Sequence, residues 1–249
     1  MNSIETLIPI IILIVIGYAL KRFNVLKPDD ALALNKIVIN IAIPSLIFLA
    51  MYKVNLSILP IIAPIPFICL LVGITSGIIA YIISKGLKYP KKTTWSVVSA
   101  SAMFNSGFLG YPIVLGVFGA DGLIRAVFYD MGSMVLFIAF GVFFSIIFAG
   151  KYSEILKRAL LFPPLWAIAF GLFMNYLQVN IGFILINTLN YLSQAAIPLI
   201  MISLGLSLEL QGIIENFRAV LSVSTVKLII APLIALLFVL IFGILCICL

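Results

Sequence analysis

Long apolar segments separated by short polar ones follow one another along the whole chain. A segment of about 20 apolar residues is long enough to cross the roughly 30 Å hydrocarbon core of a bilayer as a helix. The first segment has its basic residues behind it and lacks an A-x-A site, so it is not read as a cleaved signal peptide. The pattern predicts eight membrane-spanning helices, at residues 4–21, 34–52, 57–84, 94–118, 123–149, 160–177, 182–207 and 219–247.

The composition fits a chain that lies in lipid. The 249 residues are 64% hydrophobic and 9% charged, whereas about a quarter of the residues of a soluble domain are charged. Such a chain has too little polar surface to cover itself in water, so the lipid bilayer is its expected partner. The sequence therefore predicts an all-α multi-pass membrane protein.

Several function classes find no support in the residues. Histidine is absent from the sequence, which removes the commonest metal ligand and general base. Paired intramembrane carboxylates and metal-ligand spacings are absent as well, so we expect no enzyme, no bound metal and no cofactor. The net charge of +7 does not predict nucleic acid binding, because the basic residues recur in short loops between the apolar segments.

Lysine and arginine gather on one side of the predicted membrane, the side that is cytoplasmic in most membrane proteins. Of the 15 basic residues, Lys53 and Arg125 fall on the opposite side, and Lys227 lies in or near a span. This asymmetry predicts a cell-membrane protein whose N-terminus lies outside. The residues on the cytoplasmic side are Lys21, Arg22, Lys27, Lys36, Lys85, Lys88, Lys91, Lys92, Lys151, Lys157, Arg158 and Arg218.

Three short matches relate the two halves of the chain. They are Pro9 and Gly17 with Pro163 and Gly171, Ala42–Pro44 with Ala196–Pro198, and Ile61–Pro64 with Ile229–Pro232. The first two matches are separated by 154 residues and the third by 168, a difference that a longer loop explains. Internal repeats in a hydrophobic chain are typical of secondary transporters.

This offset places five spans in each repeat. Because five is odd, the second copy starts on the opposite side of the membrane, which predicts inverted five-helix repeats at residues 1–150 and 151–249. The counterpart of the fourth span is expected near 262–286, beyond Leu249, so the second repeat is expected to be incomplete, with three spans. We interpret the sequence as a truncated product of a longer reading frame, with a natural short form as the alternative.

The fourth span contains residues that interrupt a helix. Asn105 and Ser106 are followed by Gly107 and Gly110, which weaken a helix, and by Pro112, which lacks an N–H and clashes with the carbonyl four residues earlier. Backbone that unwinds near the bilayer centre is tolerated only against protein or a wet cavity. We therefore predict that these residues bind substrate. The alternative is a kinked helix that serves packing alone.

The chain resembles the auxin efflux carrier family along its whole length. That family includes plant auxin exporters and prokaryotic malate or malonate permeases. The motifs that carry the resemblance are LNKIVINIAIPSLIFLAM in the second span, NSGFLGYPIVLGVFGADG in the fourth, YDMGSMVLF in the fifth and VKLIIAPL in the eighth.

The resemblance implies a ten-helix fold with a scaffold domain and a transport domain. It also implies that broken helices 4 and 9 cross at the substrate site, that Asn105 helps to hold a carboxylate, and that Pro112 lies at the crossover. Helix 9 has no counterpart in this sequence, which puts transport by this polypeptide alone in doubt, and a homodimer is left open. The corresponding segments are 4–52 and 160–207 for the scaffold, and 57–149 and 219–249 for the transport domain.

Asp130 in the fifth span is a further candidate. Intramembrane carboxylates are costly and are functional by default, so Asp130 is expected to carry a coupling proton or to organise the substrate site. The alternative is a solvated carboxylate near Arg125 at the outer interface. A second group of candidates either lies on the scaffold side of the cavity or bends packing helices: Asn40, Pro44, Ser45 and Pro198.

Three functional hypotheses remain. The leading one is a secondary transporter that moves a small organic anion, a carboxylate such as malate, malonate or an auxin-like acid, across the cell membrane by alternating access. The second is a cation/proton antiporter of similar fold. Such proteins need acidic residues at the bilayer midplane, and Asp130 is the one such residue available, which counts against this hypothesis. The third is a truncated membrane protein without transport activity.

Overall fold

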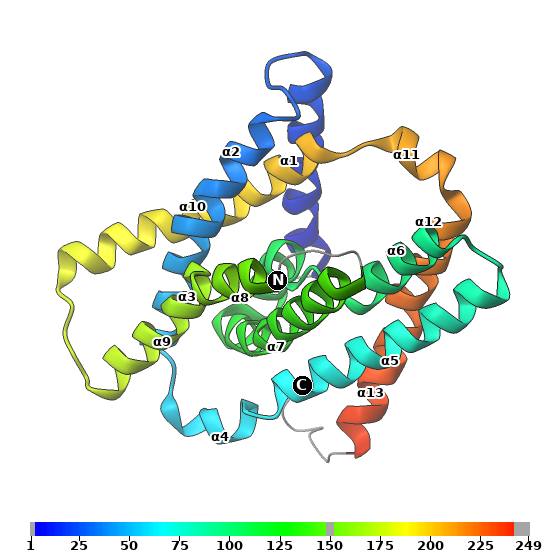
Figure 1. Cartoon of the computed structure of the whole chain (residues 1–249). Coiled ribbons are helices and arrows are strands. Elements are labelled where there is room, and N and C mark those ends of the chain that lie inside the picture. The colour runs from blue at the N-terminus through cyan, green and yellow to red at the C-terminus, as the bar shows by residue number, and fades with distance from the viewer. Residues whose placement is uncertain (1–2, 148–151, 242–249) are drawn as a thin grey trace. The chain divides into compact units, whose positions relative to one another are not determined.

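Every regular element of the described residues, 3–147 and 152–241 of this computed structural model, is helical (Figure 1). The predicted repeat boundary at 150 and 151 lies outside these residues, and so does the part of the predicted final span that follows residue 241. The α-helices are α1 (Ser3–Arg22), α2 (Asp30–Ile37), α3 (Ile43–Tyr52), α4 (Leu59–Ile62), α5 (Ile65–Gly86), α6 (Lys91–Ala102), α7 (Tyr111–Ile147), α8 (Tyr152–Leu160), α9 (Pro163–Tyr176), α10 (Phe183–Ser207), α11 (Leu210–Glu215), α12 (Phe217–Thr225) and α13 (Ala231–Ile241). The π-helical turns are η1 (Val38–Ala42), η3 (Ser106–Gly110) and η4 (Val226–Ile230), and η2 (Leu56–Ile58) is a 3-10 turn.

Long apolar helices confirm the predicted all-α multi-pass class. Five helical stretches of the described chain are long and apolar enough to cross a membrane: Asp30–Tyr52, Leu56–Gly86, Ser106–Phe144, Phe183–Ser207 and Phe217–Ile241. The third of these stretches holds the second half of the predicted fourth span together with most of the fifth. Gly119 separates the two, with φ 68° and ψ −157°, a backbone conformation that glycine adopts at little cost.

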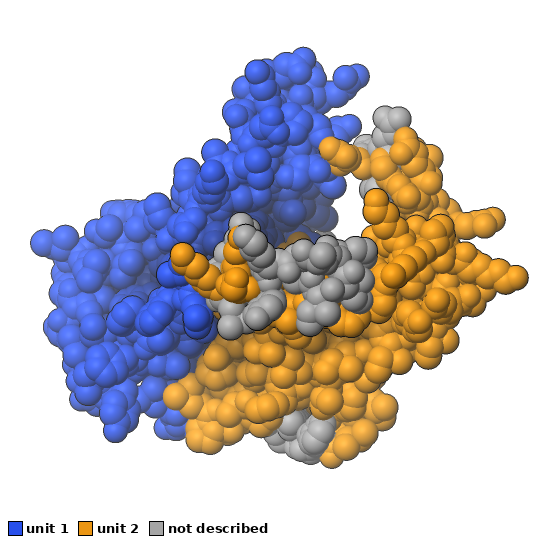
Figure 2. Space-filling model, viewed as in Figure 1, with its two compact units in different colours: residues 1–57, 107–127, 160–208 blue, residues 58–106, 128–159, 209–249 orange. Residues whose placement is uncertain are grey.

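The chain folds into two compact units, each assembled from separate stretches of sequence (Figure 2). Unit 1 comprises 1–57, 107–127 and 160–208, and unit 2 comprises 58–106, 128–159 and 209–249. The inversion of the two repeats, and the scaffold and transport roles, remain predictions.

Unit 1 is built around two close helix crossings. Gly17 in α1 lies against the backbone of Ile202 in α10, and Gly171 in α9 lies against Phe48 in α3. The two pairs are equivalent under the 154-residue offset, since Gly17 shifts onto Gly171 and Phe48 shifts onto Ile202. In both pairs the missing side chain of glycine allows the two backbones to approach, as small residues do between membrane helices.

Two of the π-helical turns have a proline at the same spacing. Turn η1 ends two residues before Pro44, and η4 ends two residues before Pro232. The ring of a proline clashes with the carbonyl four residues earlier, and the extra residue of a π turn moves that carbonyl aside. Pro198, the repeat counterpart of Pro44, lies instead within the continuous helix α10.

Unit 2 has α5 and α6 as an antiparallel hairpin, and α12, η4 and α13 pack against it. Ala80 of α5, Val97 and Val98 of α6 and Val226 of η4 form one buried cluster. A hydrogen bond joins the hairpin turn to α12: the hydroxyl groups of Tyr89 and Ser222 lie 3.1 Å apart. These contacts fix the direction of α6, which leads into the predicted site.

Candidate functional site

The fourth span is interrupted between α6 and η3. Helix α6 ends at Ala102, and Met103 is extended, with φ −93° and ψ 131°. The interruption covers Met103–Asn105, and the helix resumes at Ser106. A broken fourth span is thus confirmed, although the non-helical residues lie before the predicted glycines rather than among them.

Pro112 explains this displacement. Turn η3 ends two residues before Pro112, the same spacing that η1 and η4 show before their prolines. A π turn accommodates the proline ring without unwinding the chain, and Gly107 and Gly110 therefore lie inside the turn. The prediction that the segment from Asn105 to Pro112 unwinds is wrong beyond Asn105.

Residues of α7 hold the interruption in place within unit 2. The hydroxyl of Ser106 donates a hydrogen bond to the carboxylate of Asp130. Ser133, one helical turn further on, lies with its hydroxyl 3.4 Å from the carbonyl oxygen of Phe104, at the long end of hydrogen-bond distance. The rings of Phe104 and Tyr129 are 5.8 Å apart between centroids. Since residues three or four apart share a helix face, one face of α7 supports the interrupted segment.

Close packing against α5 also holds this part of α7. A side chain on Gly132 would overlap the carbonyl oxygen of Pro66 and lie 2.8 Å from the Cβ of Cys69. Cys69 is fully buried. Asp130 and Ser133 are thereby carried on a helix with little freedom to shift.

The interruption offers polar groups of both kinds. Ser106 begins a helical segment, whose first N–H groups carry a positive partial charge. Asp130 is half-buried and brings a carboxylate to this helix start, while Asn105 is exposed and offers an amide donor and acceptor. A small anion or a proton is the kind of ligand that such an arrangement can hold.

The other predicted site residues belong to unit 1. Asn40 donates from Nδ2 to the carbonyl of Lys36 at 2.7 Å, and buried Ser45 donates to the carbonyl of Ile41 at 2.8 Å. Both side chains are thus bonded to their own helix. Five further candidates belong to this unit: Gly107 and Gly110 in η3, Pro112 in α7, Pro44 in α3 and Pro198 in α10.

Three residues of the site were not predicted from the sequence. Phe104 lies in the interruption, and Tyr129 and Ser133 contact it. Each of the three belongs to a residue type that is common in apolar spans. The one signal available was the spacing of Tyr129, Asp130 and Ser133, which places all three on the same helix face.

Comparisons with known proteins bear on the function. The model of a family described as membrane transport protein matches residues 2–154 and 147–248. An uncharacterized transporter of Methanothermobacter thermautotrophicus is 45% identical over 235 residues, which cover 94% of this chain and 78% of the relative. An uncharacterized transporter of Methanocaldococcus jannaschii is 40% identical over 220 residues, 84% of this chain and 70% of the relative. The chain therefore belongs to the membrane transport protein family.

Proposed function

We propose that this membrane transporter moves a small organic anion by alternating access, with the interrupted fourth span as its substrate site. The carboxylates suggested by the resemblance to auxin efflux carriers, such as malate, malonate or an auxin-like acid, are the proposed substrates. The observation that carries the proposal is the pairing of Ser106 with Asp130 at the start of η3, beside exposed Asn105. The N-out orientation in the cell membrane is part of the proposal.

The site chemistry suits a carboxylate. The N–H groups at the start of η3 supply partial positive charge, and the amide of Asn105 supplies a neutral donor that costs less to desolvate than a lysine. A hydrogen bond to a charged group contributes about 1.5–3 kcal/mol. A carboxylate held by Asn105 and the helix start is therefore bound without a buried cation.

Asp130 has a specific role in this proposal. An anionic substrate at the start of η3 lies close to the carboxylate that Ser106 contacts, and two like charges repel each other. Protonation of Asp130 removes this repulsion, so binding of the anion and binding of a proton favour each other. We propose that Asp130 couples uptake of the anion to a proton.

Uptake into reconstituted vesicles tests the assigned site. Radiolabelled malate and malonate are offered to the unchanged protein and to Asn105→Ala, and loss of a charged hydrogen bond is expected to lower uptake by about tenfold or more. Asn190→Ala is the matched control, because the hydrogen bond that Asn190 accepts from Ser193 uses its backbone carbonyl and not its side chain. Equal uptake by Asn105→Ala and the unchanged protein would refute the site.

A cation/proton antiporter is the second candidate, and the carboxylate of Asp130 at the interruption is the observation that favours it. The two functions differ in the solute whose transport moves a proton: a cation in the antiporter and an organic anion in the anion carrier. Sodium or potassium added to vesicles without any organic anion should release protons if the protein is an antiporter, and should leave the internal pH unchanged if it is an anion carrier.

A further inference from the structure

Unit 2 has an apolar groove whose lining does not include the interruption at Met103–Asn105. The groove has a volume of about 460 Å³ and runs between α5, α6 and α7. The lining residues that matter here are Gly77, Tyr81, Trp95, Val98, Phe140 and Phe143.

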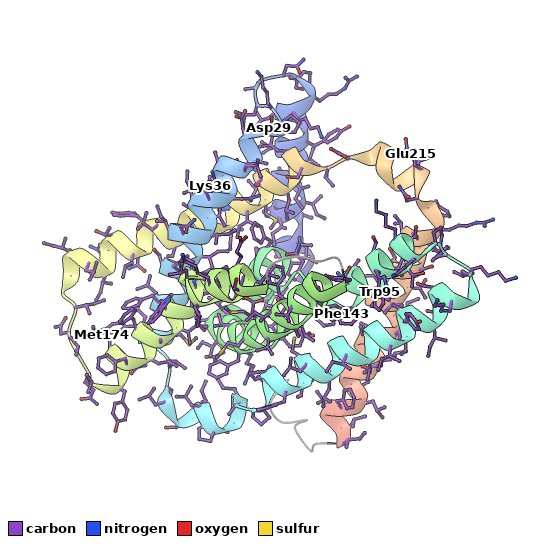
Figure 3. All side chains as sticks on the ribbon, in the orientation of Figure 1. Asp29, Lys36, Trp95, Phe143, Met174 and Glu215 are labelled. Atoms are coloured by element: carbon purple, nitrogen blue, oxygen red, sulfur yellow. The ribbon has the colours of Figure 1, made fainter. Side chains whose placement is uncertain are left out.

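Aromatic rings form one end of this groove. The ring centroids of Trp95 and Phe143 are 5.1 Å apart, and those of Trp95 and Tyr81 are 5.8 Å apart, and Figure 3 labels the first two residues beside each other. Tyr81 and Phe143 are each about two-fifths exposed. Trp and Tyr prefer the boundary between hydrocarbon and headgroups, so this end of the groove is expected near that boundary.

Lysines lie directly beyond the aromatic end. Lys85 follows Tyr81 by one helical turn on α5, and its Nζ lies 5.5 Å from the centre of the Tyr81 ring. On the antiparallel helix α6, Lys91 precedes Trp95 by one turn and is exposed. Both lysines therefore lie on the same side of the rings, toward the turn that joins the two helices.

The turn between α5 and α6 carries further lysines and contains no acidic residue. Lys88 and Lys92 are exposed there, and no aspartate or glutamate occurs between Asp30 and Asp121 in the sequence. The position of the turn is fixed by the hydrogen bond between Tyr89 and Ser222. An apolar groove thus ends at a cluster of four lysines.

We propose that this groove binds one anionic phospholipid of the surrounding bilayer, with an acyl chain along Trp95 and Phe143 and the phosphate at the lysines. Charge complementarity selects this occupant, because a zwitterionic lipid gains less from the lysines and a water-soluble anion gains nothing from the groove. Each lysine near an anionic membrane surface is expected to contribute roughly a fivefold preference. The inference does not depend on which solute the protein transports.

Fluorescence quenching by brominated lipids tests the proposal. The chain has two tryptophans, so Trp166→Phe leaves Trp95 as the reporter. The protein is placed in phosphatidylcholine vesicles that contain either brominated phosphatidylglycerol or, at the same fraction, brominated phosphatidylcholine. The association constant obtained from Trp95 quenching should be at least roughly fivefold higher for the anionic lipid.

A reporter elsewhere on the same helix is the matched control. Phe67 on α5 is 67% exposed and has no lysine within a helical turn, so Phe67→Trp in a chain with both native tryptophans changed to Phe reports on bulk lipid. It should be quenched equally by the two lipids. Equal quenching of Trp95 by the two lipids, or a shielded Trp95 because a second copy of the chain covers the groove, would overturn the proposal.

Two lysine variants distinguish the effect of a lost positive charge on lipid preference from the effect of a disturbed fold. Lys85→Gln should lower the anionic preference at Trp95 by roughly fivefold. Lys88→Gly also removes a charge, but Lys88 has a φ of 54°, which glycine adopts more readily than lysine, so this variant should keep its fold. If both variants keep the full preference of the parent protein, the lysines do not hold the phosphate and the proposal fails.

Discussion

Gly17 in α1 and Ile202 in α10 meet so closely that a Cβ on Gly17 would overlap the carbonyl oxygen of Ile202. Gly205, one turn further along α10, fits equally tightly, because a Cβ there would lie 2.7 Å from the backbone nitrogen of Tyr18. The repeat-related crossing is less tight: a Cβ on Gly171 would lie 2.9 Å from the carbonyl oxygen of Phe48. Both crossings depend on backbone contact that any side chain would prevent.

Gly17→Ala is expected to destabilise the protein by about 1–3 kcal/mol, since the added methyl group meets backbone and not a flexible side chain. Gly171→Ala should have a smaller effect in the same direction, because its crossing has more space. Thermal unfolding in detergent, followed by helical circular dichroism, measures both. Gly86→Ala is the control: nothing lies within 4 Å of that Cβ, and alanine should stabilise a helix there by about 0.5–1 kcal/mol. Similar unfolding temperatures for all three variants would contradict the crossing.

The hydrogen bond between Ser106 and Asp130 leads to a prediction on coupling. Asp130→Asn keeps an acceptor oxygen but removes the exchangeable proton, so anion uptake should no longer respond to a pH gradient across the vesicle membrane. Ser106→Ala removes the donor and leaves the carboxylate, so uptake should fall by a few fold and still respond to the gradient. Uptake with and without the gradient is compared for each variant. A gradient response in Asp130→Asn would exclude this carboxylate as the proton carrier.

The sequence predicts the helices and the interruption of the fourth span better than it predicts the contacts between helices. Glycine and proline mark the interruption of the fourth span, yet Pro112 acts on the residues before it through a π turn, and the non-helical residues are Met103–Asn105. Apolar periodicity predicts helices but does not say which faces meet. The contacts of Ser133 with Phe104 and of Gly132 with Pro66 join segments far apart in the sequence. Such contacts follow from tertiary packing, for which serine and glycine carry no specific signal.

Asn175 at the end of α9 joins two helix ends of unit 1. Its Nδ2 donates to the carbonyl oxygens of Met51 at 3.0 Å and Val54 at 2.7 Å. Asn175→Ala leaves both acceptors without this donor and is expected to cost about 1–3 kcal/mol of stability. Asn175→Asp keeps the shape but lacks the donor, so it should be at least as destabilising. Thermal unfolding measures the stability of both variants. An Asn175→Asp variant as stable as the parent would show that the amide donor does not contribute to stability.

The turn after α9 carries a residue in an unfavourable conformation. Gln178 has a φ of 52°, and the N–H groups of Gln178 and Val179 donate to the carbonyls of Asn175 and Met174, both at 3.0 Å. This hydrogen-bond pattern usually has glycine at the left-handed position, because a side chain costs roughly 1–2 kcal/mol there.

Gln178→Gly is therefore expected to stabilise the protein by about 0.5–1 kcal/mol, since the relief of strain is partly offset by the greater freedom of glycine in the unfolded chain. The same substitution in the middle of α10, at exposed Gln194, should destabilise by about 1 kcal/mol, because a helical backbone gains nothing from glycine. Unfolding temperatures of the two variants should therefore move in opposite directions from that of the parent. A shift of the same sign in both would mean that the turn after α9 does not hold Gln178 in the left-handed conformation.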